Sequence, residues 1–415
     1  MERIIMHIDV NNAFLSWSAI DLLNKGFGYD IRDSYAVIGG DEKTRRGIVL
    51  AKSPLAKKMG VQTGETLYSA RKKCPALRTF PPNYLWYQEM SKSLFQLLNK
   101  YTCDIEVFSI DECFLDYGKV QKLYGDPYSF AQKIKDEIEN TLGFTVNIGI
   151  ANNKLCAKMA SDFSKPNQIH TLYETEIIEK MHPLPISDLF GVGKKSSEKL
   201  KKIGIKTIGD LAHTTPEHLY PYFKNQSLKL IEMANGIDIS EVISTKEENK
   251  GISNSTTLEK DVTSKVELYQ VLESISNNVA LELRRQNKYT YVICVQLKDQ
   301  YFRSYSHQKK LKNATNLTKE IFETSKLLLD EMWEGEPIRL VGIRLDHLTS
   351  TSMHQVSLFE TVEKRDQDVT LERTLDSLKE KYGYQVIDTA SLLEGKKVGF
   401  KKAKHCHMCN ENFAK

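Results

Sequence analysis

The chain has 415 residues with 40% hydrophobic content, which is long enough for about two to four domains with their own cores. It contains no N-terminal signal pattern and no apolar run of about 18 residues, so the sequence predicts neither export nor a membrane span and favours a cytoplasmic protein. The net charge of +4 is too small to indicate nucleic acid by itself, and seven scattered cysteines fit a reducing compartment.

The first part of the chain alternates between short apolar runs and amphipathic segments. The pattern predicts a strand over 3–10, a helix over 12–26 and then a basic, turn-rich stretch over 35–84 that is typical of a small inserted subdomain. The next predicted elements are helix 85–102, the extended segment 107–116, helix 129–143, strand 144–151 and helix 152–165. This alternation predicts a mixed sheet with helices packed on it.

The second part begins with short helices separated by glycines, from 184 to about 237, and the charged stretch 244–251 is typical of a linker. Beyond it the predicted elements are strand 252–261, helix 264–286, strands 289–298 and 301–306, helix 315–333 and strand 337–347. This βαββαβ order is the ferredoxin-like arrangement. Residues 361–415 are highly charged, and their pattern predicts no particular fold.

Three carboxylates stand at the ends of apolar runs. Asp111 and Glu112 interrupt VFSIDECFLD (107–116), where a tight turn would hold them, and Asp9 ends the first strand. A solvated turn explains one acidic pair without any chemistry. Three carboxylates at the ends of central strands, however, are the ligands that Mg²⁺ prefers, and two such ions about 3.5–4 Å apart catalyse phosphoryl transfer.

Five longer motifs follow one another along the chain: HIDVNNAF, LAKSPLAKKMGV, VFSIDECFLD, VNIGIANNKLCAKMASDFSKPN and DLFGVGKKSSEKLKKIGI. Together they resemble, from about residue 3 to residue 360, the Y-family translesion DNA polymerases, particularly the bacterial DNA polymerase IV type. The resemblance implies an α+β multidomain fold, a right-hand polymerase. Its expected parts are a palm (1–24 and 85–170), small fingers (25–84), a helical helix-hairpin-helix thumb (171–240), a linker (241–250), a ferredoxin-like little finger (251–350) and a tail (351–415).

The resemblance also implies a function. It implies template-directed addition of deoxynucleotides to a primer 3′ end, with low fidelity on damaged templates and with two Mg²⁺ ions. The family's metal ligands correspond to Asp9, Asp111 and Glu112, with the carbonyl group of Val10 completing the site. The implied partners are primer-template DNA, deoxynucleoside triphosphates and the sliding clamp of the replication machinery, and we expect a monomer.

Three further residues are implied to contact the nucleotide. Phe14 would ordinarily be a core aromatic residue, but the resemblance makes it the steric gate that excludes a ribose 2′ hydroxyl. Lys165 could be a helix C-terminal charge, and the resemblance makes it a triphosphate ligand. Lys57 and Pro54 stand where many members have arginine and tyrosine. Arginine can bind a phosphate bidentately and lysine cannot, so we expect Lys57 to contact a phosphate only as a single charge.

The lysine-rich segment FGVGKKSSEKLKKIGI favours a helix-hairpin-helix. Gly191 and Gly193 would open the backbone toward a DNA phosphate, and Lys194 and Lys195 would add attraction. A plain glycine-punctuated helical turn is the alternative. DNA binding at such a segment should not depend on sequence and should weaken with salt.

Two short motifs lie near the C-terminus. QVSLF (355–359) resembles the peptide by which bacterial polymerases dock on the sliding clamp, with Gln355, Leu358 and Phe359 as its contacts. HCHMC (405–409) contains Cys406 and Cys409, which is half of a structural zinc site. No second pair is nearby, so we predict no zinc.

Two other functions compete with the polymerase. IGGDEK (38–43) contains GGDE, as in diguanylate cyclases, but those acids should lie in a hairpin between apolar strands, and this tetrad precedes KTRRG in the basic inserted region. The other rival is a catalytically inactive DNA-binding accessory factor, against which the presence of all three carboxylates argues. A metal-dependent incorporation assay separates the three.

Overall fold

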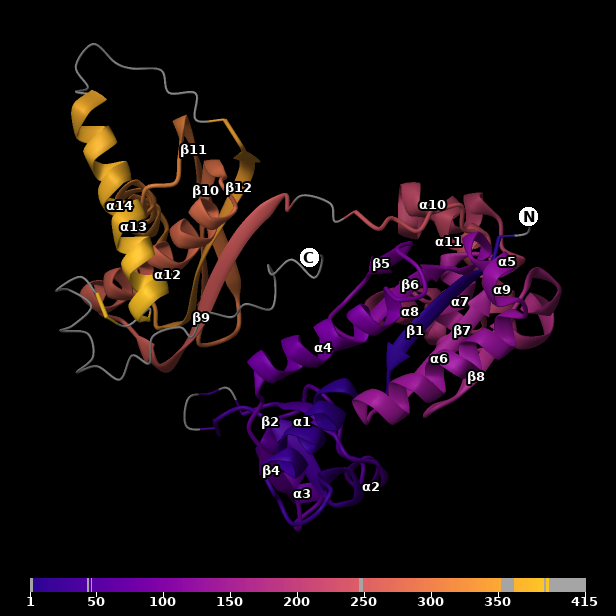
Figure 1. The fold of residues 1–415 in the computed structure, drawn as a ribbon. Coiled ribbons are helices and arrows are strands. Elements are labelled where there is room, and N and C mark those ends of the chain that lie inside the picture. Colours follow the sequence, from indigo (N-terminus) through magenta and orange to yellow (C-terminus); the bar gives the residue numbers. More distant parts are fainter. Residues whose placement is uncertain are drawn as a thin grey trace. The chain divides into compact units, whose positions relative to one another are not determined.

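The computed structural model describes residues 3–42, 45, 47–245, 249–351, 362–383 and 386–387. They form two compact units (Figure 1): one contains the described residues up to Gly40 and from Ile48 to 245, and the other contains the described residues between Asp41 and Gly47 and from 249 onward. The first unit contains the predicted palm, fingers and thumb, and the second contains the predicted little finger. Within the described ranges, no helix is both long and apolar enough to cross a membrane.

The first unit is built on a five-stranded sheet with the order β5-β6-β1-β7-β8. Its strands are β1 (Ile5–Val10), β5 (Ile105–Val107), β6 (Glu112–Asp116), β7 (Val146–Ala151) and β8 (Ile169–Leu172). The central strand β1 pairs antiparallel with β6 and β7, and every residue of β1 is buried. Both faces of the sheet are covered, which explains why every residue of the first strand is buried, including the polar His7 and Asp9.

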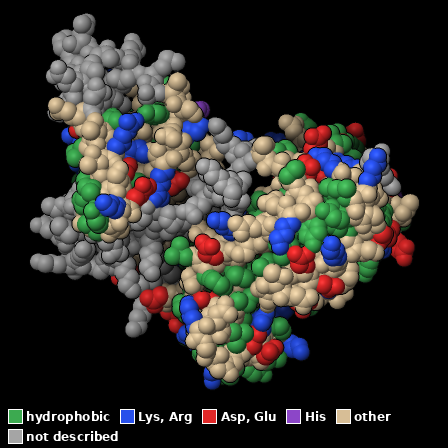
Figure 2. Space-filling model, in the orientation of Figure 1, with side chains coloured by type: hydrophobic (Ala, Val, Ile, Leu, Met, Phe, Trp, Pro, Cys, Tyr) green, Lys and Arg blue, Asp and Glu red, His purple; other side chains and the backbone are tan. Residues whose placement is uncertain are grey.

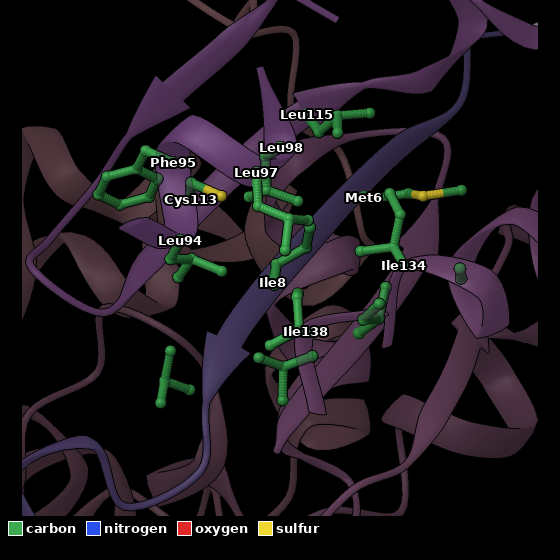
Figure 3. Packing of buried hydrophobic residues seen from close by; sticks show 14 of the residues in the cluster. Met6, Ile8, Leu94, Phe95, Leu97, Leu98, Cys113, Leu115, Ile134 and Ile138 are labelled. Atoms are coloured by element: carbon green, nitrogen blue, oxygen red, sulfur yellow. The ribbon is translucent and has the colours of Figure 1, made fainter. Parts of the chain in front are cut away.

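Helices cover the two faces of this sheet. They are α4 (Tyr84–Leu98) and α6 (Pro127–Leu142) on one face and α7 (Lys154–Asp162) on the other. Met6 and Ile8 of β1 pack among residues of α4 and α6 (Figure 3), whereas Ile5 packs with α7. Because side chains alternate along a strand, His7 and Asp9 lie on the same face as Ile5, toward α7.

α7 lies very close to β7. A Cβ atom added to Gly149 would lie 2.0 Å from the carbonyl oxygen of Ala157 and 2.5 Å from the backbone nitrogen of Ser161. Only glycine permits this approach. The close packing brings the polar side chains of α7 to the end of β1.

The predicted inserted subdomain follows α1 (Ala13–Asn24). Its elements are β2 (Ala36–Gly39), β3 (Val49–Lys52), α2 (Pro54–Lys58), α3 (Leu67–Lys73) and β4 (Arg78–Phe80). The sheet order is β3-β2-β4, and β2 pairs antiparallel with β3. The GGDE tetrad begins at Gly39, so Asp41 and Glu42 lie in the connection between these two strands. The tetrad thus lies in the predicted inserted region, but in the connection of a short hairpin, so its local context alone does not separate it from a cyclase motif.

The predicted thumb consists of short helices. They are α8 (Lys194–Lys202), α9 (Ile208–Ala212), α10 (Pro216–Phe223) and α11 (Ser227–Ala234), and a four-residue α5 (Gln121–Tyr124) lies in the palm. The buried residues of the thumb form one apolar cluster with those of α7. β8 extends to Leu172, beyond the predicted palm boundary at 170.

The second unit has the predicted βαββαβ order. Its elements are β9 (Gly251–Val262), α12 (Lys265–Arg285), β10 (Tyr289–Asp299), β11 (Ser304–Thr315), α13 (Thr318–Met332) and β12 (Ile338–Thr349). They form an antiparallel sheet with the order β11-β10-β12-β9. β11 runs well past the predicted end at 306, because its residues are exposed and polar and therefore show no apolar alternation.

An additional helix, α14 (Val362–Tyr382), lies in the segment for which the sequence predicts no fold. Arg284 of α12 attaches it to the second unit. Its Nε donates to Asp376 Oδ2 at 2.6 Å, and its Nη2 lies 3.0 Å from Glu372 Oε2. The arginine side chain is only 10% exposed, so these ion pairs are largely shielded from water.

We expect Arg284→Met to release α14. An unpaired buried charge costs about 3–5 kcal/mol, so the helix should detach, and limited proteolysis within 362–383 should become at least about tenfold faster. Arg285→Met is the control, because Arg285 meets Glu380 at 3.5 Å with a more exposed side chain. Equal protection of α14 in both variants would contradict this role of Arg284.

Candidate active site

The three predicted carboxylates lie together at one end of the central strands. Asp9 is buried at the end of β1, and Glu112, the first residue of β6, is its antiparallel partner. Asp111 lies in the turn between β5 and β6, where its carbonyl oxygen accepts a hydrogen bond from the backbone N–H of Val10 at 3.0 Å. The predicted hairpin is confirmed, and Val10 lies beside all three acids.

Glu112 is held by two residues of the α7 face. The Lys158 ammonium donates to Glu112 Oε1 at 2.9 Å, and His7 Nε2 lies 3.7 Å from Glu112 Oε2, which is too long for a hydrogen bond. Burial acts to raise the pKa of Glu112, but His7 and Lys158 outweigh it and hold that pKa at about 2. Burial lowers the pKa of His7, whose Nδ1 bonds Ser161 Oγ at 2.8 Å. Glu112 is therefore ionised over the whole physiological range.

Asp111 has the opposite electrostatic environment. Burial raises the pKa of Asp111, a hydrogen bond from Ser109 Oγ at 2.7 Å opposes this, and the neighbouring carboxylates of Asp9 and Glu112 raise it further. Asp9 accepts a hydrogen bond from the Lys165 ammonium. Burial acts to lower the pKa of Lys165, but Asp9 and Asp162 raise it above its usual value, so Lys165 carries its positive charge.

These carboxylates fit divalent cations of the magnesium type. The ligands are oxygen atoms, burial together with the neighbouring carboxylates raises the pKa of Asp111, and two lysine ammonium groups pair with Asp9 and Glu112 as counter-charges. No group of three or more His, Cys, Asp or Glu side chains among the described residues is assembled as a metal cluster. Because the Lys165 ammonium donates to Asp9, a cation bound at Asp9 would have to compete with it.

A network of buried amides places the loop that carries Lys165. Asn147 of β7 is fully buried, and its Nδ2 donates to the carbonyl oxygens of Ser161 and Ser164. Its Oδ1 accepts from Asn11 Nδ2 at 3.0 Å and from the backbone N–H of Gln168. All hydrogen-bonding sites of this amide are therefore used, and the loop is fixed beside the end of β1.

Phe14 lies on the first turn of α1, between palm and fingers. Its ring stacks on Tyr87 at 4.8 Å between centroids and 14° between planes, and it meets Tyr84 edge-on at 6.4 Å. The side chain is half-buried and packs against the apolar clusters of both subdomains. The core interpretation and the gate interpretation are compatible, because the Phe14 side chain is packed on Tyr87 and yet only half-buried.

Lys57 is exposed on α2, and Pro54 begins this helix after the Ser53 cap. Burial lowers the pKa of Lys52, at the end of β3, and the nearby charge of Lys57 lowers it further. The Lys52 carbonyl oxygen accepts a hydrogen bond from Asn12 Nδ2 at 2.7 Å, which ties β3 to the start of α1. Lys52 and Lys57 thus place two positive charges in the fingers, and the Asn12 hydrogen bond links the strand of Lys52 to the start of the helix that carries Phe14.

The predicted helix-hairpin-helix loop precedes α8. Gly191 has a φ of +84°, which favours glycine, and Gly193 is the N-cap residue of α8. Lys194 and Lys195 are exposed on the first turn. Figure 2 shows lysine and arginine side chains spread among acidic and apolar ones on the visible face. Within α8, five of nine residues are lysines and one is glutamate, so this helix is a local concentration of positive charge.

Sequence reasoning missed His7, Lys158, Asn147 and Lys52. Each lies inside one of the motifs, but its significance depends on a contact with a distant segment. The clamp-peptide residues Gln355, Leu358 and Phe359 lie outside the described residues, as do Cys406 and Cys409.

Comparison with protein families gives three matches. Residues 8–162 match the impB/mucB/samB family, residues 249–358 match the C-terminal domain of that family, and residues 174–205 match the helix-hairpin-helix motif of the same family. The matches cover the palm and fingers, the little finger and the first part of the thumb.

Curated relatives match almost the whole chain. A DNA polymerase IV of Clostridium acetobutylicum is 48% identical over 95% of this chain and 99% of its own length. One of Alkaliphilus oremlandii is 34% identical over 95% and 100%, respectively. A solved Y-family DNA polymerase chimera, Dbh-Dpo4(243-245)-Dbh, shares the fold, with a TM-score of 0.72 and 24% identity over 84% of this chain and 100% of its own. The chain therefore belongs to the Y family of translesion DNA polymerases, in the DNA polymerase IV type, and is a DNA-directed DNA polymerase.

Proposed function

We propose that Asp9, Asp111 and Glu112 hold two Mg²⁺ ions, with the carbonyl oxygen of Val10 as a further ligand, and that this site adds deoxynucleotides to a primer 3′ end. The observation that supports it most is the meeting of all three carboxylates at one end of β1 and β6. When bound, Mg²⁺ supplies the positive charge that activates the attacking hydroxyl and neutralises the leaving pyrophosphate.

The residues around the carboxylates have separate roles in this proposal. Lys158 keeps Glu112 ionised and fixed in orientation. The Lys165 side chain, whose ammonium donates to Asp9, would turn toward an entering nucleotide and donate hydrogen bonds to its triphosphate. The amide network of Asn147 holds the Lys165 loop at the correct distance. Lys57 contributes a second, weaker phosphate contact from the fingers.

We expect Phe14→Ala to relax sugar discrimination, because the accessible edge of the ring would occupy the space of a ribose 2′ hydroxyl. The ratio of kcat/KM for deoxynucleotides over ribonucleotides should fall roughly 10²-fold. Phe14→Tyr retains the ring and should keep the ratio of the wild type. An unchanged ratio in Phe14→Ala would exclude the gate.

The thumb and the tail supply the other proposed contacts. Gly191 and Gly193 expose backbone amides to a DNA phosphate, with Lys194 and Lys195 beside them. The peptide 355–359 binds the sliding clamp, and the enzyme acts as a monomer in the cytoplasm. Removal of residues 355–359 should abolish stimulation by the clamp and leave basal synthesis intact, and equal stimulation of the truncated protein would contradict this proposal.

One assay separates this function from its rivals. Purified protein is incubated with Mg²⁺, primer-template DNA and either deoxynucleotides or GTP. The polymerase lengthens the primer and releases pyrophosphate, a cyclase makes a soluble cyclic product, and an inactive accessory factor makes neither. A cyclic product or the absence of extension would overturn the proposal.

A further inference from the structure

Apolar side chains are exposed where the palm sheet meets the thumb. Val107 and Phe108, at the end of β5, are 41% and 49% exposed, and Phe190, just before Gly191, is 37% exposed. Phe108 and Phe190 are far apart in sequence, yet their rings pack edge-on with centroids 6.0 Å apart. An exposed aromatic contact between two elements indicates a binding surface.

Both rings are fixed from the inside. Phe114, which is almost fully buried, packs against Phe108 at 5.6 Å and against His7 at 4.7 Å. The backbone N–H of Phe190 points at the sulfur of Met159, 3.3 Å away. A continuous row of aromatic rings therefore runs from His7, the neighbour of Glu112, to the loop that opens α8. The outer faces of its last two rings are accessible.

The position of these rings suits one ligand. Phe108 lies three residues before Asp111, in the hairpin that carries the carboxylates, and Phe190 directly precedes the loop Gly191–Gly193. In a DNA polymerase the primer 3′ end must reach the carboxylates, and a DNA phosphate is proposed to lie at that loop. Between two phosphates a strand presents its deoxyribose, whose apolar face packs on an aromatic ring whatever the base.

We propose that Phe108 and Phe190 form an apolar contact for the deoxyribose units of the primer strand next to its 3′ end. The contact rests on the proposed function. It links the phosphate held at the thumb to the hydroxyl at the carboxylates, so the two phenylalanines are positioning residues that favour primer DNA of any sequence. Because the contact is uncharged, it adds affinity without adding to the salt dependence of binding.

The test measures DNA affinity and kinetics separately. Phe108→Ala, Phe190→Ala and the double variant are titrated against fluorescent primer-template at several salt concentrations, and KM is measured for DNA and for nucleotide. Each single variant should bind DNA about five- to thirty-fold more weakly, with KM for nucleotide changed less than about twofold. The slope of log Kd against log salt should stay at its wild-type value, whereas Lys194→Ala should reduce it by about one.

Two controls keep the outcomes distinct. Tyr128→Ala removes an equally exposed aromatic ring from α6 and should leave DNA affinity unchanged. If an alanine variant does not fold, Phe108→Leu and Phe190→Leu, which keep apolar bulk but no ring, should still weaken binding measurably. Wild-type affinity in the folded variants, or an equal rise of KM for nucleotide, would overturn the contact. Absence of primer extension by the wild type would instead overturn the proposed function.

Discussion

Asp111→Asn should abolish primer extension while leaving the protein at least as stable as the wild type. The amide keeps the size of the carboxylate and can still accept the hydrogen bond from Ser109, but it removes one of the negative charges needed by a divalent cation. The loss of transition-state stabilisation should lower kcat/KM by about 10³-fold or more.

The expected stability of the Asp111→Asn variant follows from the raised pKa of Asp111. Its pKa is raised in the folded protein, so above the unfolded-state pKa the ionised carboxylate destabilises the fold, and the neutral amide removes this penalty. Thermal unfolding in EDTA at neutral pH should therefore give an equal or higher Tm. Asp116→Asn, at the other end of β6, is the matched control and should retain activity. An active Asp111→Asn variant would mean that the metal site is wrongly placed.

Lys158→Met should lower kcat by about 10- to 100-fold at saturating Mg²⁺. Lys158 pairs with Glu112 at 2.9 Å and with Asp162 at 3.5 Å, and its 9% exposed side chain both orients Glu112 and keeps it ionised. Residues behind a metal ligand have effects of about this size. Steady-state kinetics with varied Mg²⁺ and nucleotide would measure the loss, which should persist when both are saturating.

Lys154→Met provides the control for this change. Lys154 is on the same helix, one turn earlier, and pairs with Glu106 at 2.7 Å with a side chain that is also largely buried. Its loss removes a comparable ion pair without touching a candidate metal ligand. Equal losses of kcat in the two variants would show that Lys158 matters for folding alone.

The carboxylates were predictable because their signal is local. Asp9, Asp111 and Glu112 each interrupt or end an apolar run, and a strand or a hairpin places such residues whatever the rest of the chain does. The βαββαβ order of the second unit follows from the same kind of pattern. The resemblance to the Y family combined these local signals into the prediction of a DNA polymerase, and the comparisons confirm that prediction.

The residues behind the carboxylates were not predictable in this way. Lys158 looks like any helix lysine until α7 packs on β7 through Gly149, and Asn147 looks like a polar interruption of a strand until the Lys165 loop folds over it. Their roles depend on tertiary contacts that no spacing encodes. The hairpin around GGDE could not be predicted because β2 and β3 are only four residues long, so the local context of a short motif is weak evidence for or against a function.

The most direct test of the active-site proposal is single-nucleotide incorporation by the wild-type protein on four primer-templates that differ only in the next template base. Each of the four deoxynucleotides is offered separately, with Mg²⁺ or with EDTA. We expect the primer to gain mainly the complementary nucleotide on every template in Mg²⁺ and none in EDTA. Extension that persists in EDTA, or incorporation that ignores the template base, would contradict the proposed two-metal, template-directed synthesis at Asp9, Asp111 and Glu112.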